Sequence, residues 1–590
     1  MTVRAPIGQH APRPSAHIPP PLPRTVAPVP PVPQRHAGPA WLQSQGPLGL
    51  IVAVLIALGY AWWLYGYPML SGSSPFWWRD NADITQYLAG FNAYVHEPWH
   101  WPLLRLNSLN TPDGTLATFL DTVPLYAALL KLVHPGAGYW NPYGLWIALC
   151  FTLQGVGAWW ICREARVRSW AALAALALLL ASFPALTFRI AHTSLMSQWM
   201  LVFALAIYLR SVRLGRVALG SWALLLVGGF YINIYLFVMA SAIFAADVLR
   251  QWLLRSPYGL AVGRPAWRAP LLAPVIVYGL LFVSMWITML PMPPGAGGRE
   301  WGFGHYSMNL LAPLHGGMLL HFPNPTAHDG QGEGYNYLGV FLLALTAFVV
   351  KLRGQRDPAF WRRHGALLVT LVLLAAYALS NTVYLGNAQL FSLRLPHWID
   401  GLTATFRSSG RFFWPVGYAI VVFTVLGAAR HLRTAQAAMV LAAVVALQLW
   451  DLREHHERVR GAVAQAGGHA IDPARWNAFL GPDVKALQHY PPFRCSDSTP
   501  SKALLPVMAY AVQHGYPLST GYIARASKPC DNHGAEIARL PANVAVAFEK
   551  QAYPHQQDAE RMMGANATCT DMDIVFLCRR NGPNLIQNKP

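Results

Sequence analysis

The sequence predicts an α-helical polytopic membrane protein that ends in a small α/β domain outside the cytoplasm. Its 590 residues are 54% hydrophobic and only 12% charged, whereas soluble domains average about 25% charged residues. Apolar stretches long enough to cross a bilayer recur between residues 45 and 450. Most of the cysteines lie in the polar segment that follows, which points to an oxidising compartment.

Residues 1–44 form a proline-rich N-terminal arm that carries arginines and no acid. A segment of this composition buries too little apolar surface to fold. We therefore expect a disordered cytoplasmic tail, or a proline-rich ligand for a partner protein. We expect no secretory signal peptide, because the first apolar run begins only near Gly46 and no small-residue cleavage site follows it.

Residues 45–450 are expected to form the membrane domain, with a first outer loop over 70–142. A transmembrane helix needs roughly 20 apolar residues, and about eleven segments fit: 47–69, 143–162, 170–188, 195–211, 218–231, 233–249, 270–290, 336–352, 366–385, 412–430 and 434–450. The short arginine clusters between them fall on one side, which is the positive-inside pattern. The formal charge of +19 therefore reflects topology and not nucleic-acid binding. The same pattern places the N-terminus inside and the C-terminus outside.

The segment 218–249 is too long for one span and short for two. Both of its flanks are basic, which favours two helices that turn near Tyr231–Asn233. The alternative is one long tilted helix, which would invert the topology of every later segment.

Residues 451–590 are expected to form the extracytoplasmic domain, because short apolar runs alternate there with helical patterns. Its cysteines are Cys495, Cys530, Cys569 and Cys578. Two disulfides are the first interpretation of four cysteines in a compact polar region. Three pairings are possible, and of these we expect Cys495–Cys530 with Cys569–Cys578. A zinc site is the alternative, although the spacings contain no Cys-x-x-Cys pair. Disulfides require an outside C-terminus, in agreement with the charge pattern.

Carboxylates are concentrated on the predicted outer face of the membrane domain. Only twelve Asp and Glu residues occur between Met1 and Trp450, and nine of them fall in outer segments: Asp80, Asp83, Glu97, Asp113, Asp121, Glu300, Asp329, Glu333 and Asp400. Five of the nine share the first outer loop. An acid held at the membrane surface is a candidate general base for chemistry on a lipid-linked substrate.

The candidate catalytic residues of this loop are Asp83, Asp80 and Asp121. If 82–95 is helical, Asp83 and Gln86 share one face of the helix. Each acid also has a structural interpretation. Asp83 and Asp121 could cap helices, and Asp80 could pair with Arg79.

Four basic residues are candidates for holding a phosphate: Arg189, His192, Arg407 and Arg411. The first two lie one helical turn apart in a predicted outer turn, and the last two are four residues apart where a span enters from outside. Guanidinium groups bind phosphate oxygens through charge-assisted, bidentate hydrogen bonds. The alternative for the arginines is snorkelling toward lipid headgroups.

The substrate-binding candidates are Gln86, Trp99, His305, Tyr306, Asn309, Glu333 and Tyr335. The last five lie in a glycine-rich outer loop over 299–339. Irregular backbone beside a membrane is tolerated where it lines a cavity, and a capped interfacial loop is the alternative. No Ser/His/Asp triad stands out, and the spacing of residues predicts no metal site.

These segments together resemble a bacterial family of GT-C-like multi-pass membrane proteins, over roughly residues 75–575. The resemblance is carried by Asp83-Ile-Thr-Gln86, His96-Glu-Pro-Trp-His-Trp-Pro102, Leu120-Asp-Thr-Val-Pro-Leu125, Arg189-Ile-Ala-His192, Gly302-Phe-Gly-His-Tyr-Ser-Met-Asn-Leu310, Glu333-Gly-Tyr-Asn-Tyr-Leu-Gly339 and Phe406-Arg-Ser-Ser-Gly-Arg411. The combination is specific for the family and much less specific for an activity. Ahead of the first acid, Arg79-Asp80-Asn81 replaces the more common Gly-Asp pair, so either Asp80 or Asp83 is the catalytic acid.

The resemblance implies a GT-C-type glycosyltransferase of the bacterial inner membrane. Such enzymes move a sugar, with inversion, from a polyprenyl-phosphate donor, here to a cell-envelope glycan acceptor. A first-loop acid serves as the base, and Asp83 matches it best; basic residues hold the phosphate. A divalent cation such as Mg²⁺ or Mn²⁺ remains an open expectation. Two other functions also stay open: a transporter or flippase of lipid-linked glycans, and a non-catalytic envelope scaffold.

Overall fold

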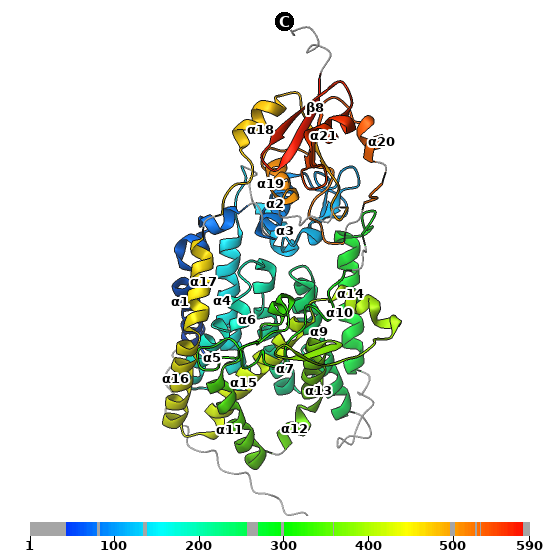
Figure 1. Cartoon of the computed structure of the whole chain (residues 1–590). Coiled ribbons are helices and arrows are strands. Elements are labelled where there is room, and N and C mark those ends of the chain that lie inside the picture. The colour runs from blue at the N-terminus through cyan, green and yellow to red at the C-terminus, as the bar shows by residue number, and fades with distance from the viewer. Residues whose placement is uncertain are drawn as a thin grey trace, which may run out of the picture. The chain divides into compact units, whose positions relative to one another are not determined.

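A computed structural model describes residues 43–79, 83–133, 138–255, 269–296, 300–357, 359–465, 467–495, 502–525, 528–531 and 533–581 (Figure 1). Trp41–Pro590 form one compact unit, and the fold given below is that of its described residues. The expected N-terminal tail falls almost entirely outside the described residues, and so does Asp80.

Eight helical segments among the described residues are long and apolar enough to cross a membrane. They are α1 (Pro47–Ser71), α4 (Tyr143–Glu164), α5 (Trp170–Ala181) with α6 (Pro184–Thr187), η4 (Thr193–Met196) with α7 (Trp199–Leu214), α9 (Ile234–Arg255), α10 (Ala269–Thr288), η8 (Ser409–Phe413) with α15 (Trp414–His431), and α16 (Thr434–Asp451). Each of the eight coincides with an expected span. The chain is therefore mostly helical and has the composition of a polytopic membrane protein.

The expected number of about eleven spans is wrong, because three of the predicted segments form shorter helices. These are α8 (Leu219–Phe230, 12 residues), α11 (Val340–Arg356, 17 residues) and α13 (Gly365–Leu379, 15 residues). A 12-residue helix rises about 18 Å, well below the roughly 30 Å of a hydrocarbon core. The apolar runs around α11 and α13 include non-helical residues: Gly339 has φ 90°, Ser380 has φ 66°, and Thr382–Leu385 form strand β3.

The segment 218–249 forms two helices, as the basic flanks predict. Helix α8 ends at Phe230 and α9 begins at Ile234. Between them the Asn233 side-chain oxygen accepts hydrogen bonds from the backbone N–H groups of Tyr235 and Leu236, which is how an N-cap satisfies the first turn of a helix. A single long helix is thereby excluded.

The first outer loop is itself structured. It contains η2 (Pro75–Trp78), α2 (Asp83–His96), β1 (Arg105–Leu106) paired with β2 (Thr115–Leu116), η3 (Ala117–Leu120) and α3 (Pro124–Val133). The predicted helix over 82–95 is confirmed by α2, which is buried from Ile84 to Val95. Gly90 lets α2 approach η3 closely, because a Cβ there would lie 2.7 Å from the Leu120 Cβ atom.

The C-terminal domain is a small α/β unit, as expected. It contains α18 (Pro473–Leu480), β5 (Ala486–Tyr490), α19 (Leu504–Gln513), α20 (His533–Ala538), β6 (Val544–Glu549), α21 (Gln556–Met563), β7 (Ala567–Met572) and β8 (Val575–Arg580). Helix α17 (Arg453–Ala464) falls within the range expected for this domain but lies along α1 (Figure 1): His456 is hydrogen-bonded to the Tyr60 hydroxyl, and Arg460 donates to the Trp63 carbonyl. The four strands follow the order β5-β6-β8-β7, with β5 parallel to β6 and the other pairs antiparallel. In Figure 1 this sheet lies among α18, α20 and α21.

Both expected disulfides are present, Cys495–Cys530 and Cys569–Cys578. The zinc alternative is thereby excluded for these four residues. Disulfides fit an extracytoplasmic location for the C-terminal domain, because they persist in oxidising compartments.

One segment of the C-terminal domain, residues 518–525, is bound across the first outer loop. The backbone N–H of Leu518 donates to the Ser108 carbonyl, and that of Ala524 donates to the Phe119 carbonyl. The Gln86 side chain of α2 donates to the Tyr522 carbonyl at 2.7 Å. We call residues 518–525 the docking segment, because these hydrogen bonds hold the two regions together.

Candidate active site

A polar cavity of about 520 Å³ opens between the first outer loop, the neighbouring ends of several candidate spans and the docking segment. Its charged walls are Asp83, Asp121, His192, Glu300, Glu333, Arg407, Arg411 and Arg525. Its size falls within the range of roughly 300–1,000 Å³ that is usual for ligand sites. The polar candidates Gln86 and Tyr306 also line it. Residues separated by more than 400 positions therefore share one site.

Asp83 and His192 form a close pair on one wall of the cavity. The Asp83 carboxylate lies 3.5 Å from Nδ1 of His192, and the Tyr87 hydroxyl lies 3.4 Å from the same nitrogen. Burial lowers the pKa of His192, although the neighbouring Asp83 opposes this shift. A carboxylate placed beside an imidazole on a cavity wall is an arrangement suited to accepting a proton from a bound hydroxyl.

Asp121 lies on the same cavity in an unusual backbone conformation. It follows η3 with φ 53°, and Val123 two residues later has φ 54°. Positive φ is a genuine outlier for a β-branched residue, and such strain persists where the surrounding structure holds it, often at functional sites. Burial raises the pKa of Asp121 to about 6; Arg411 opposes this rise and Asp83 adds to it. The carboxylate is thus a stronger base than an ordinary Asp.

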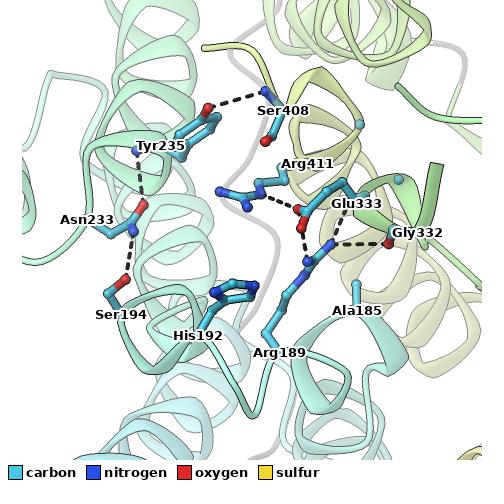
Figure 2. Close-up of polar contacts among 12 residues, drawn as sticks. Ala185, Arg189, His192, Ser194, Asn233, Tyr235, Gly332, Glu333, Ser408 and Arg411 are labelled. Carbon is cyan, nitrogen blue, oxygen red and sulfur yellow. Dashed lines mark hydrogen bonds and ion pairs between the residues drawn. The ribbon is translucent and has the colours of Figure 1, made fainter. Parts of the chain in front are cut away.

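Glu333 is held between two arginines, Arg189 from the turn between two candidate spans and Arg411 from η8 at the start of another (Figure 2). Its Oε2 atom lies 2.9 Å from Arg189 Nη1 and accepts a 2.8 Å hydrogen bond from Arg411 Nε. Arg189 Nη2 also donates to the Glu333 carbonyl at 2.7 Å. Burial disfavours the ionised carboxylate, but Arg411 and Arg189 outweigh it and hold the pKa of Glu333 well below its usual range. Glu333 therefore stays ionised and fixes both guanidinium groups.

The two arginines have different positions relative to the cavity. Arg189 is 2% exposed and lies behind Glu333, outside the cavity walls. Arg411 lines the cavity, and within the described part of the chain only its Nε atom forms a hydrogen bond. Its two Nη groups are thus left for an anionic ligand, and Figure 2 shows this guanidinium pointing toward His192.

Arg407 is the second cation on the cavity wall that the sequence singled out. It donates to the Trp301 carbonyl at 2.9 Å and lies 3.8 Å from Glu300. Glu300 also pairs with Arg494 of the C-terminal domain. The ion pairs of Glu300 with Arg407 and Arg494 connect the 300–306 loop to the disulfide-bonded region. They also hold Arg407 at the edge of the cavity.

Four expected substrate residues lie outside this cavity: Trp99, His305, Asn309 and Tyr335. Trp99 packs under the Lys131 ammonium, 4.7 Å from its ring centroid. Asn309 donates to the Gly386 carbonyl and to Gln331. Tyr335 stacks on His455. These three side chains hold loops in place.

His305 belongs to a different cluster, the one group of possible metal ligands found among the described residues. It lies with His328 and Asp329 so that one ligand atom from each is within 4.8 Å of the others. The two imidazole rings stack at 4.4 Å between centroids. Two imidazoles and a carboxylate suit Zn²⁺ or Mn²⁺ better than Mg²⁺. The spacing of residues did not reveal this group, because 23 positions separate its histidines.

The docking segment supplies cavity residues that the sequence analysis missed, namely Tyr522, Ala524 and Arg525. Arg525 has φ 64° and donates to the Thr405 carbonyl at 3.1 Å. An arginine close to a glycine, as Arg525 is to Gly521, is only a weak sequence signal of a binding site. Its pairing with a loop more than 100 residues away could not be read from periodicity.

Two family models match the chain. One, described as a domain of unknown function (DUF6311), covers residues 54–453. The other, described as the DUF6311 C-terminal domain, covers residues 475–580. The cavity is built from both matched regions, since the docking segment falls in the second. Among curated proteins, none matches the chain.

Proposed function

The chain belongs to the DUF6311 family, and we propose that it is a GT-C-type membrane glycosyltransferase acting on the outer face of the bacterial inner membrane. It transfers a sugar from a polyprenyl-phosphate donor to a cell-envelope glycan acceptor. The observation that carries the proposal is the cavity that joins the carboxylates Asp83 and Asp121 to the guanidinium groups of Arg411 and Arg407. A hydroxyl can displace a phosphate in such a cavity, because a carboxylate can accept the proton of the hydroxyl and a guanidinium can stabilise the leaving phosphate.

Asp83 is the general base in this mechanism. The acceptor hydroxyl attacks the anomeric carbon while Asp83 takes its proton, and the bond from that carbon to the phosphate oxygen breaks. The electron pair leaves with the phosphate, and the anomeric configuration inverts. The pairing of Asp83 with His192 supports this role, and Asp121 orients the acceptor through a second hydroxyl.

Arg411 and Arg407 neutralise the leaving phosphate. Arg411 suits this role because Glu333 fixes its Nε atom and leaves its Nη groups toward the cavity. Arg189 acts indirectly, as a positioning residue for Glu333, since it is buried behind that carboxylate. A guanidinium that is already held in place loses little freedom when it binds the transition state.

The donor's lipid chain enters from the membrane side. Phe230, Ile232 and Met289 add an apolar wall to the cavity, and α9 and the η8–α15 segment begin beside it. A cavity at the ends of apolar spans suits a substrate with a phosphate at the membrane surface and its prenyl tail in the bilayer.

The test is donor consumption by purified protein in nanodiscs, with a panel of radiolabelled polyprenyl-phosphate sugars and an extract of cell-envelope glycans as the source of acceptor. We expect wild-type protein to consume at least one donor and Asp83→Asn to lose activity by a factor of about 100 or more. Asp113→Asn is the matched control, because Asp113 lies in the same loop but outside the cavity. Wild-type turnover by Asp83→Asn would contradict the role of Asp83. If folded wild-type protein consumes no donor, the transferase proposal is wrong, and transport or scaffolding takes its place.

A further inference from the structure

A second cavity, of about 380 Å³, runs along α15, which lines it from Val416 to Arg430. Arg411 lines the active-site cavity and Arg430 lines the second one. The helix between these residues rises 1.5 Å per residue, which places them about 28 Å apart along its axis. We call this second cavity the distal groove. The arginine-bearing end of the distal groove therefore lies nearly one hydrocarbon thickness, roughly 30 Å, from Arg411.

The distal groove has mainly aliphatic and aromatic walls. They come from α7, α11, α12 (Ala359–Arg363), α13 and α15. No carboxylate lines it, whereas Arg353, Arg430 and His364 do. These helices lie within or beside the predicted spans. An apolar chain from the bilayer is therefore the natural occupant of the groove.

Arg353 is the feature that specifies the charge of the occupant. It is 3% exposed, and its guanidinium carbon lies 4.0 Å from the Phe360 ring centroid and 5.1 Å from that of Phe423. Its Nε atom is buried and has no hydrogen-bond acceptor. Among the described residues no carboxylate lies within ion-pair distance of Arg353. Asp357, four residues later, donates its backbone N–H to the Arg353 carbonyl, and its charge acts at longer range on both Arg353 and Arg430.

A buried guanidinium without an ion pair is unfavourable, because its charge is removed from water and only partly compensated. Here a single acid, Asp357, is shared between the charges of Arg353 and Arg430. Arg is always protonated in proteins, so the charge cannot be relieved by loss of a proton. Basic pockets between membrane helices bind anionic lipid headgroups. An anion beside Arg353 would accept from the unpartnered Nε atom, and Arg430 at the exposed rim adds a second cation.

We propose that the distal groove binds one anionic phospholipid, with an acyl chain along its apolar walls and the phosphate beside Arg353 and Arg430. The apolar walls favour a lipid over free phosphate, and the unpartnered Arg353 favours an anionic lipid over a zwitterionic one. This inference does not depend on the transferase proposal, since it concerns residues remote from the active-site cavity.

The test is native mass spectrometry of the full chain released from detergent, titrated with phosphatidylglycerol or phosphatidylcholine. We expect one phosphatidylglycerol to bind at least tenfold more tightly than phosphatidylcholine, and Arg353→Gln to remove this preference. Arg362→Gln is the matched control, because Arg362 is an exposed arginine of α12 that does not line the groove. It is expected to bind as the wild type does.

A second variant keeps the test sharp if Arg353→Gln does not fold. Ala375→Phe fills the groove from α13 and leaves both arginines in place, so it is expected to weaken binding of both lipids. Equal affinity for the two lipids in wild type, or the same loss of preference in Arg362→Gln, would overturn the proposal. Displacement of phosphatidylglycerol by millimolar inorganic phosphate would also overturn it, because it would show that the acyl chain contributes nothing.

Discussion

The Asp83 carboxylate lies 3.5 Å from Nδ1 of His192 and thereby joins the first outer loop to the turn between two spans. We predict that His192→Gln lowers donor turnover about 100-fold, because misplacing a reacting group by about 1 Å costs on that order. His100→Gln is the control, since His100 pairs with Glu97 in the same loop but outside the cavity. Equal turnover by the two variants would show that His192 does not orient Asp83.

We predict that donor turnover depends on the ionisation of Asp121. Burial raises the pKa of Asp121 to about 6, so its ionised form predominates only above that pH. We expect wild-type turnover to fall as the pH decreases through about 6, approaching a tenfold loss per unit. Asp121→Asn removes the titrating group, so its turnover should be low and lack this transition between pH 5 and 7. The measurement is initial rate against pH, with Asp113→Asn as the control that keeps the wild-type profile. An unchanged transition in Asp121→Asn would assign it to another group.

We predict that the folded protein loses stability when the charge of Glu333 is removed. Its folded pKa lies well below the ordinary value, so its stabilisation is present above an unfolded pKa of about 4.3 and is lost as the pH falls toward the folded value. At pH 7 we expect Glu333→Gln to destabilise the protein by roughly 3–5 kcal/mol, because two arginines lose their counter-ion. The measurement is denaturation in detergent at pH 7 and at pH 4, where the difference should shrink.

The double variant Glu333→Gln with Arg189→Gln is the control for this mechanism. It removes the buried guanidinium together with the carboxylate, so it should recover part of the stability lost by Glu333→Gln alone. If the double variant is less stable than the single one by the full cost of each change, the ion pair does not account for the effect.

Local patterns predicted the parts of the site that are close in sequence. The helical spacing of Asp83 and Gln86 predicted that both share one face of the helix, and both line the cavity. Arg407 and Arg411, four residues apart at the start of a span, also reached the same cavity. In each case helix geometry or short separation limits where the side chains can go.

The contacts that the sequence could not predict join distant segments. Arg189 is separated from Glu333 by 144 positions, and no hydropathy pattern distinguishes an arginine that pairs from one that snorkels. The docking segment reaches α2 from a domain more than 400 positions later. Hydropathy also overestimated the spans, because it does not detect the left-handed residue Ser380 that ends α13.

The position of the Cys495–Cys530 disulfide leads us to predict a functional role for the C-terminal domain. It closes a loop of 35 residues that contains the docking segment, whereas Cys569–Cys578 joins the neighbouring strands β7 and β8 across nine residues. By the chain-entropy model the two bonds stabilise the domain by about 4 and about 3 kcal/mol. Their contributions to stability are thus similar, but only the first encloses residues of the cavity wall.

We therefore predict that Cys495→Ser with Cys530→Ser lowers donor turnover about tenfold or more, because the docking segment carrying Tyr522 and Arg525 loses its covalent constraint. Cys569→Ser with Cys578→Ser should lower the unfolding temperature of the domain and leave turnover within about twofold of wild type. Both double variants are measured for turnover and for thermal unfolding in the same nanodiscs. If the two pairs lower turnover equally, the effect follows domain stability and not the docking segment. If neither lowers turnover, the segment is held in place by its hydrogen bonds to the first outer loop alone.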